Sequence, residues 1–235
     1  MMRGLGRVVQ DLGALVLPVE CAGCRDQRPG LRQGVCPECV AALGDLRPRP
    51  VRPMPAPEGL PPCVALGPYA GPLREVLLAY KDHGRHGLAR PLGALLAEVV
   101  AVAVGPVRPV SLVPVPDTPA AARARYGDHL SRLARHCAQR LRRAGWPVEV
   151  RSAVRALPRP DSVTLDSAGR AASAAAAFRA RRRGRPLPAG TALVVVDDIV
   201  TTGSTLAAVS RVLTATGRVP SVAAVLAATG RRHHR

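Results

Sequence analysis

The chain has 235 residues, a formal net charge of +18 and a pI near 11.4. Apolar residues make up 47% of the sequence but aromatic residues only 2%, so the core must be packed with Val, Leu and Ala. This composition argues against an aromatic-rich β-sandwich and favours helices packed on a parallel sheet. The charge favours an anionic partner, but the excess is nearly all arginine in an Ala-, Gly- and Pro-rich sequence, which a high-GC codon bias would also produce.

No run of 18 apolar residues occurs, so we expect no membrane span. The first seventeen residues carry Arg3 and Arg7, but Asp11 interrupts their apolar region. We therefore interpret the apolar residues from Leu5 to Val16 as one face of a helix rather than as a secretory signal. Six cysteines, four of them clustered, indicate a reducing compartment, and we expect a cytoplasmic protein.

The clustered cysteines form two Cys-x-x-Cys pairs separated by eleven residues. Two such pairs bring four thiolates to one tetrahedral point, which suits Zn²⁺ and can fold a segment too short for a core of its own. We predict a structural zinc site without an open coordination position, and so without catalysis. Redox chemistry at one pair is the alternative, although a second pair this close is redundant for it. The predicted ligands are Cys21, Cys24, Cys36 and Cys39.

The domain organisation follows from these cysteines and from the prolines after them. Residues 1–47 are predicted to form an N-terminal helix and a four-cysteine, zinc-ribbon-like module. Seven prolines in residues 48–62 exclude a helix or a central strand and predict a stiff linker. The main α/β domain is expected over residues 63–230, and residues 231–235 are a basic tail.

The main domain is predicted to begin with a strand at Cys63–Leu66 and two helices, over Pro72–Tyr80 and Leu88–Val104. A polar break that begins at Lys81 separates the helices. Lys81 is the only lysine in the chain. In a sequence that otherwise uses arginine, a lysine indicates a position where a compact, mobile ammonium group suits better than a planar guanidinium, with a chance surface lysine as the alternative.

The segment from Ser111 to Pro116 is predicted to be a strand that runs into a loop made rigid by its prolines. Arg123 and Arg125 lie between this loop and the next helix. They would either hold a pyrophosphate or stand in solvent ahead of the helix. We interpret His129, close to the start of that helix, as a cap or packing residue rather than as an acid or base.

The remaining segments lie on either side of the most apolar stretch of the chain. Val148–Val154 and Ser221–Ala227 are predicted to be strands, and Ser167–Ala176 an alanine-rich helix that follows a loop at Arg159–Thr164. The arginines between Arg179 and Arg185 form the densest basic run. They are interpreted as a solvated turn, with a contact to nucleic acid or phosphate as the alternative.

The most informative stretch begins with Leu193–Val196, which reads as a strand buried on both faces. Asp197 and Asp198 are expected at its carboxyl end, and five small residues, Thr201 to Thr205, then open a helix that reaches about Thr216. Ligands of open α/β sheets bind beyond the carboxyl ends of strands, and a helix start offers free N–H groups to an anion. The turn is therefore predicted to bind a phosphate, and the two acids to bind ribose hydroxyls or a divalent cation.

The thirteen residues from Leu193 to Thr205 resemble the 5-phosphoribosyl-1-pyrophosphate (PRPP) signature of type I phosphoribosyltransferases. With the cysteine module, the Lys81 segment, Val113-Pro114-Val115-Pro116 and the Arg170–Phe178 stretch in this order, the chain resembles the ComF family, which is linked to DNA uptake in competence. The family's usual motif Arg-Gly-Phe-Asn-Gln is replaced here by Arg125-Tyr126-Gly127-Asp128-His129. In the Arg170–Phe178 stretch, Ser173 stands where the family has an Asn ahead of the Phe.

This resemblance implies a type I phosphoribosyltransferase fold, a central parallel sheet with helices on both faces and a mobile hood. It implies PRPP binding with Mg²⁺, and transfer of the phosphoribosyl group with release of pyrophosphate. Thr201 stands where 6-oxopurine transferases have an aspartate that serves the base, so hypoxanthine and guanine are not expected as acceptors.

The alternative is a non-catalytic protein on the same fold, which senses a phosphoribosyl ligand or nucleotide, or contacts single-stranded DNA or a helicase-type competence protein. The few aromatic residues offer little stacking surface for single strands.

The implied roles group the candidate residues into three sets. Asp197 and Asp198 are the catalytic candidates, and Lys81, Arg123 and Arg125 are the candidate pyrophosphate ligands. The implied PRPP-binding residues are Asp197, Asp198, Ile199, Val200, Thr201, Thr202, Gly203, Ser204 and Thr205.

Overall fold

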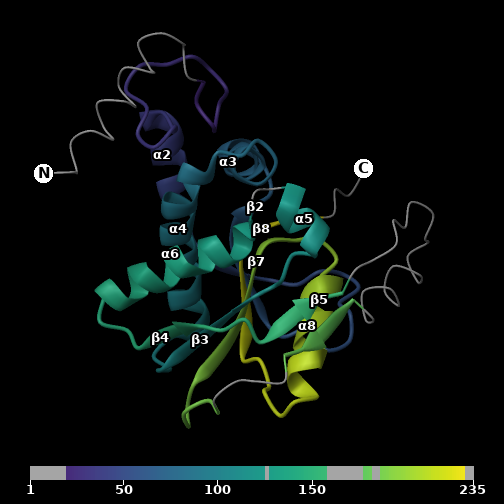
Figure 1. Ribbon diagram of the computed structural model, residues 1–235. Helices are drawn as coiled ribbons and strands as arrows, with labels where there is room; N and C mark the ends of the chain where they lie inside the picture. The colour runs from purple at the N-terminus through teal and green to yellow at the C-terminus, as the bar shows by residue number, and fades with distance from the viewer. Residues whose placement is uncertain (1–19, 125–126, 158–176, 182–185, 231–235) are drawn as a thin grey trace, which may run out of the picture.

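A computed structural model describes residues 20–124, 127–157, 177–181 and 186–230. It is an α/β structure in which helices flank a six-stranded sheet (Figure 1). The strands lie in the order β1-β2-β8-β7-β3-β4, and every neighbouring pair is parallel except β1 with β2. Their bounds are β1 Arg49–Val51, β2 Cys63–Pro68, β3 Val110–Pro114, β4 Val148–Val150, β7 Ala192–Val200 and β8 Val222–Ala228. The predicted α/β class with a mostly parallel sheet is confirmed.

The centre of the sheet is built from small and β-branched residues. Val194, Val195 and Val196 of β7 are fully buried, and so are residues 223–227 of β8 beside them. Strands covered by helices on both faces carry such continuous apolar runs. β7 extends further than the sequence indicates, because its backbone stays paired with β8 as far as Val200. Asp197 and Asp198, expected at the carboxyl end of this strand, lie among its last residues, and the strand continues past them to Val200.

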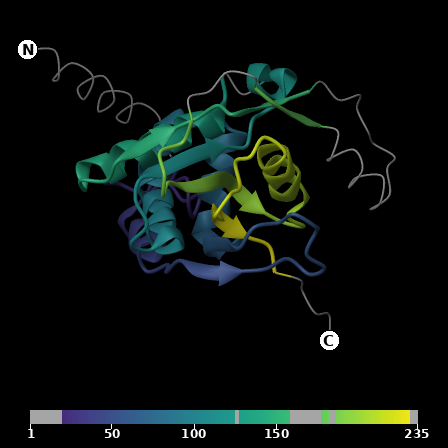
Figure 2. The same cartoon turned by 90° about the horizontal axis from the view of Figure 1, so that it is seen from below.

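Two long helices cover one face of the sheet and a third covers the other. α4 (Ala89–Val104) and α6 (His129–Arg143) pack against each other, and a Cβ added to Gly93 of α4 would lie 2.5 Å from the His136 Cβ of α6. This close approach requires the glycine. α8 (Ser204–Thr214) packs on the opposite face against β7 (Figure 2).

One helix among the described residues, His86–Val104, is long and apolar enough to cross a membrane by length and composition alone. Half of its apolar window is buried inside the structure. Its helical core, α4, packs on β2, β8 and α6, and these contacts account for its apolar composition.

The order of the strands creates one place where the chain turns in opposite directions. From β3, the chain continues through α5 (Pro119–Ala124) and α6 to β4 at the edge of the sheet. From the neighbouring β7, it continues through α8 to β8 on the other side. The carboxyl ends of β3 and β7 therefore form a topological switch point, where open α/β sheets bind ligands.

The cysteine segment packs directly on the sheet domain. Its helix, α2 (Pro37–Gly44), contacts α3 (Gly71–Lys81), and buried Cys21, Cys36 and Cys39 belong to the same apolar core as the strands. Polar contacts reinforce this packing. Arg25 pairs with Glu75 at 2.9 Å, and the Arg85 guanidinium donates to the carbonyl oxygen of Glu20 at 2.8 Å.

Residues 48–62, predicted to be a stiff linker, lie against the domain instead of spanning between two bodies. Their first part is the edge strand β1. The rest contacts α8, where the Arg211 guanidinium donates to the carbonyl oxygen of Glu58 at 2.6 Å. The prolines exclude a central strand as expected, but they permit an edge strand, because an edge leaves N–H positions unused.

A second difference concerns Val148–Val154, predicted to be one strand. The chain forms β4, which pairs with β3, and then β5 (Val154–Ala156), which leaves the sheet and pairs antiparallel with β6 (Phe178–Ala180). The single prediction failed because both pieces show the same alternation, with a charged residue between two apolar ones, and only the three residues between the pieces change direction. η1 (His86–Leu88) is the remaining element.

Several predictions fall outside the described residues. They are the N-terminal helix over Leu5 to Val16, the loop Arg159–Thr164, the helix Ser167–Ala176 with Arg170 and Ser173, the arginines at 182, 183 and 185, the candidate ligand Arg125, and the basic tail 231–235.

The shared core predicts that the cysteine module and the sheet domain unfold together. Cys39→Ser should lower the unfolding temperature of the whole chain in one cooperative transition, because Cys39 is buried against Gly23 and near Pro72 of α3. Differential scanning calorimetry with and without a chelator measures this. Asp45→Ser, at an exposed position after α2, is the control. A separate early transition with the main peak unmoved would show that the module is independent.

Candidate functional site

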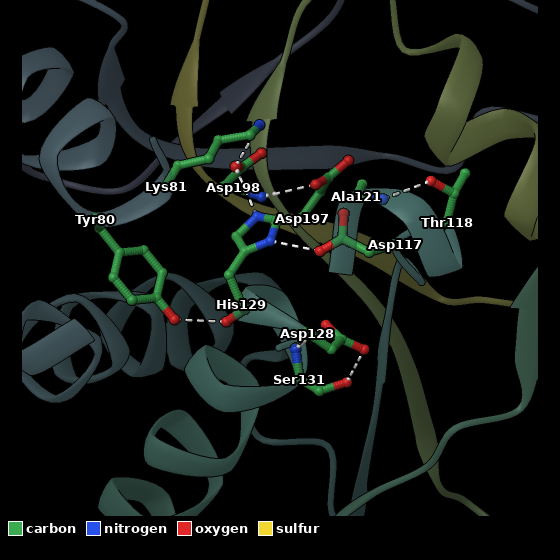
Figure 3. A network of polar contacts seen from close by, with 10 residues as sticks. All are labelled: Tyr80, Lys81, Asp117, Thr118, Ala121, Asp128, His129, Ser131, Asp197 and Asp198. Carbon is green, nitrogen blue, oxygen red and sulfur yellow. Dashed lines mark hydrogen bonds and ion pairs between the residues drawn. The ribbon is translucent and has the colours of Figure 1, made fainter. Parts of the chain in front are cut away.

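A cavity of about 510 Å³ opens at the switch point. Its polar wall comes from the ends of β3, β7 and α3 and from the starts of α6 and α8. Lys81, Asp117, His129, Asp197 and Asp198 of this wall are drawn in Figure 3. The apolar wall includes Phe178 of β6. The cavity is lined by Tyr69, Lys81, Val115, Pro116, Asp117, Thr118, Ala121, His129, Leu130, Ala156, Ala177, Phe178, Asp197, Asp198, Ile199, Thr201 and Thr205.

Asp198 is the most buried carboxylate of the site, with 7% of its side chain exposed. Its Oδ2 lies 2.8 Å from the Lys81 Nζ, at the end of α3, and 3.3 Å from the His129 Nε2, at the start of α6. Burial alone would raise the pKa of Asp198, but His129 and Lys81 hold this pKa below its usual value. Asp198 is therefore an ionised carboxylate that two cations hold in place.

His129 bridges two carboxylates. Its Nδ1 lies 2.6 Å from the Oδ2 of Asp117, in the loop after β3, while its Nε2 faces Asp198. Only the imidazolium form donates from both ring nitrogens. Burial alone would lower the pKa of His129, but the hydrogen bonds and charges of Asp117 and Asp198 raise it to about 9. The histidine is thus a cation at neutral pH.

The local sequence fixes the position of this histidine. Asp128 caps α6 by accepting hydrogen bonds from the Ser131 backbone N–H at 2.8 Å and from its hydroxyl at 2.6 Å. This cap starts the helix at His129. The Tyr80 hydroxyl of α3 donates to the His129 carbonyl oxygen at 2.6 Å, which ties the helix start to α3 (Figure 3).

Asp197 follows the opposite pattern to its neighbour. Successive side chains of a strand point to opposite faces, so Asp197 is directed away from Lys81 and His129. One of its oxygens accepts the Asp198 backbone N–H at 2.9 Å. Burial, and then the negative charge of Asp198, raise the pKa of Asp197 well above its usual value. Asp197 therefore lines the cavity as a carboxyl that readily holds a proton.

The turn between β7 and α8 has the geometry of a helix start that faces the cavity. Gly203 takes a φ of 77°, which favours glycine, and a Cβ there would lie 3.0 Å from Leu60. The helix begins one residue later, at Ser204, and ends at Thr214, two residues before the predicted end. Thr201 and Thr205 line the cavity, and the Thr202 and Ser204 hydroxyls lie 3.0 Å apart.

The structure brings together most of the predicted site residues. Asp197, Asp198, Ile199, Thr201, Thr205 and Lys81 line the cavity, and Lys81 pairs with Asp198 there. Val200 is buried in β7. Arg123 is exposed on α5 and is not among the cavity-lining residues.

Two residues of the site were missed by sequence reasoning. Asp117 is the first acid after β3, and His129 directly follows the helix cap Asp128. The sequence shows both positions, an acid just after a predicted strand and a histidine at the start of a predicted helix. Residues at such a strand end and such a helix start come together where the two meet at a switch point. The sequence interpretation of His129 as a cap or packing residue rather than an acid or base fits its burial, but it missed the two carboxylates that the ring faces at the cavity.

The four predicted metal ligands also converge. The sulfur atoms of Cys21, Cys24, Cys36 and Cys39 lie within 4.8 Å of one another, and the Cys24 and Cys36 sulfurs are 3.9 Å apart. Tetrahedral Zn²⁺ with bonds of about 2.3 Å separates its sulfurs by about 3.8 Å. Burial raises the pKa of Cys21, but backbone N–H groups of Cys24, Cys36 and Gly23 lower it to about 6. The pKa values of Cys36 and Cys39 are raised instead, so the fit to structural zinc rests on the convergence of the four sulfur atoms.

A scan against protein-family models matches no family, and a search of curated proteins finds no match.

The charge of His129 predicts a stability that depends on pH. The folded-state pKa of about 9 lies above the ordinary 6.5, so the stabilisation is fully present below pH 6.5 and is lost as the pH rises through 9. The loss is at most roughly 3 kcal/mol. Urea unfolding between pH 6 and 9.5 should show this loss in the native chain and a smaller one in His129→Gln. Equal losses in both proteins would contradict the assignment.

Proposed function

We propose that the cavity at the switch point binds PRPP. The observation that carries this proposal is the junction of β7 and α8. There, two consecutive acids are followed by five small residues, and an eleven-residue helix starts beside the cavity after a left-handed Gly203. The free N–H groups and hydroxyls of such a turn suit a phosphate. The resemblance of Leu193 to Thr205 to the PRPP signature supports the same ligand.

Each part of this ligand has a complementary group in the cavity. The 5-phosphate would bind the turn Thr201 to Thr205. The ribose hydroxyls would face Asp197, because the Oδ2 of Asp198 already accepts from Lys81 and His129. The apolar wall at Tyr69 and Phe178 would take the acceptor.

The reaction that fits this arrangement is displacement at C1′ of the ribose. The acceptor's lone pair forms a bond to C1′ while the bond from C1′ to the pyrophosphate oxygen breaks, and its electron pair leaves with pyrophosphate. Mg²⁺, when bound with the ligand, neutralises the charge of that leaving group.

Calorimetric titration with PRPP tests the proposal. We expect micromolar binding with Mg²⁺ that weakens at least tenfold without it, and at least tenfold in Asp197→Asn. Asp45→Asn, at an exposed position remote from the cavity, should bind like the native chain. Ribose 5-phosphate and pyrophosphate, titrated separately, divide the affinity between the two halves of the ligand. No binding of PRPP at millimolar concentration, or native affinity in Asp197→Asn, would refute the proposal.

A second function is favoured by a different surface. A groove between α4 and α6, with a cavity of about 280 Å³, is lined by Arg90, Ala94, His136, Gln139, Arg140 and Arg143. No acidic residue occurs in α6 itself. Phosphodiester chains bind such basic grooves largely through their charge. We propose this groove as the contact for single-stranded nucleic acid in the non-catalytic alternative.

Fluorescence anisotropy with an oligothymidylate tests this second function. Arg140→Gln combined with Arg143→Gln should weaken binding and reduce the slope of log affinity against log salt by about 1.4, from about 0.7 for each lost phosphate contact. The control, Arg49→Gln with Arg52→Gln, removes the same charge from exposed positions in and beside β1. Equal weakening in both double variants would mean that only the net charge matters and that the groove is no site.

A further inference from the structure

We propose that His129 is a positioning residue whose imidazolium joins the ends of β3 and β7 through Asp117 and Asp198. In this role it also supplies, with Lys81, the positive charge that allows a phosphate-rich ligand into the cavity. The proposal deepens the proposed function and rests on it for the identity of the ligand.

The geometry shows why this histidine acts through its neighbours. Its side chain is 6% exposed, and each ring nitrogen already faces a carboxylate, Asp117 at 2.6 Å and Asp198 at 3.3 Å. The ring therefore has no nitrogen left to act on a substrate. It can set the direction in which the two carboxylates point, and these carboxylates line the cavity (Figure 3).

The charges of the cavity explain why the cation matters. Asp117 and Asp198 contribute two negative charges, and Lys81 and His129, which face them, contribute two positive ones. These four charges balance. Removal of the His129 charge leaves one excess negative charge within a few ångströms of a ligand that carries several, and such repulsion is strong where water is excluded.

The type of side chain also matters. A glutamine at this position has a single nitrogen donor and presents its oxygen on the other side, so it cannot donate to carboxylates on two opposite sides. Imidazolium combines two divergent donors with a charge. The groups that face His129 or share its charge network come from the elements around it. They are Asp117, Asp198, Asp197, Tyr80, Lys81, the N-cap residue Asp128 and, on α6 itself, Arg132.

The test compares His129→Gln with Arg135→Gln, which removes one positive charge from an exposed position on the same helix that lines neither cavity. Calorimetry with PRPP and Mg²⁺ should show native affinity that is constant from pH 7 to 8 and falls severalfold by pH 9.5. His129→Gln should bind at least tenfold more weakly at pH 7 and lack the fall. Arg135→Gln should follow the native curve. A native affinity and native pH curve in His129→Gln would overturn the proposal.

A second variant and a ligand-free measurement cover the other outcomes. If His129→Gln does not fold, Asp117→Asn keeps the histidine but removes one carboxylate, and the fall in affinity should then move to lower pH. NMR titration of the histidine ring in the free protein is independent of PRPP. A ring that loses its charge near pH 6.5 overturns the proposal. A ring charged above pH 8 in a protein that binds no PRPP refutes the ligand and retains the positioning role.

Discussion

The structure depends on one buried carboxylate. Asp198 lies buried near the carboxyl end of a central strand of an apolar sheet, where an unpaired charge would cost several kcal/mol. Lys81 and His129 offset this cost, and they come from two helices that are separate in sequence. The ends of α3, α6, β3 and β7 must therefore meet at one point for the charge to be tolerated. The cavity is the space left beside that meeting point.

This constraint also explains why two adjacent aspartates differ. Asp198 gains two cations and stays ionised, whereas Asp197 on the other side of the strand has the charge of Asp198 beside it and tends to keep a proton. A pair of acids that looks equivalent in sequence thus offers a ligand one fixed anion and one adaptable carboxyl. Environments that separate the pKa values of neighbouring acids are common at functional sites.

The sequence predicted the parts of the fold that local patterns encode. The apolar runs of β7 and β8, the helices α3 and α4 and the meeting of four cysteines follow from periodicity and spacing. Local patterns could not predict which strands pair across the sheet. β7 continues through Asp198 because it stays paired with β8. The segment Val148–Val154 divides because its first part pairs with β3 and its last residue belongs to the strand that pairs with β6. For the same reason Lys81 was recognised as an unusual residue, but its partner was not. The two carboxylate partners of His129 were not predicted, because only the fold brings Asp117 and Asp198 to it.

The central claim is that this cavity holds a phosphoribosyl ligand, and a crystal structure of the protein grown with PRPP and Mg²⁺ tests it most directly. We expect a phosphate at the turn from Thr201 to Thr205 and a ribose against Asp197, with Lys81 and His129 still on Asp198. Ligand bound elsewhere, such as in the groove between α4 and α6, with the cavity empty, would contradict the claim.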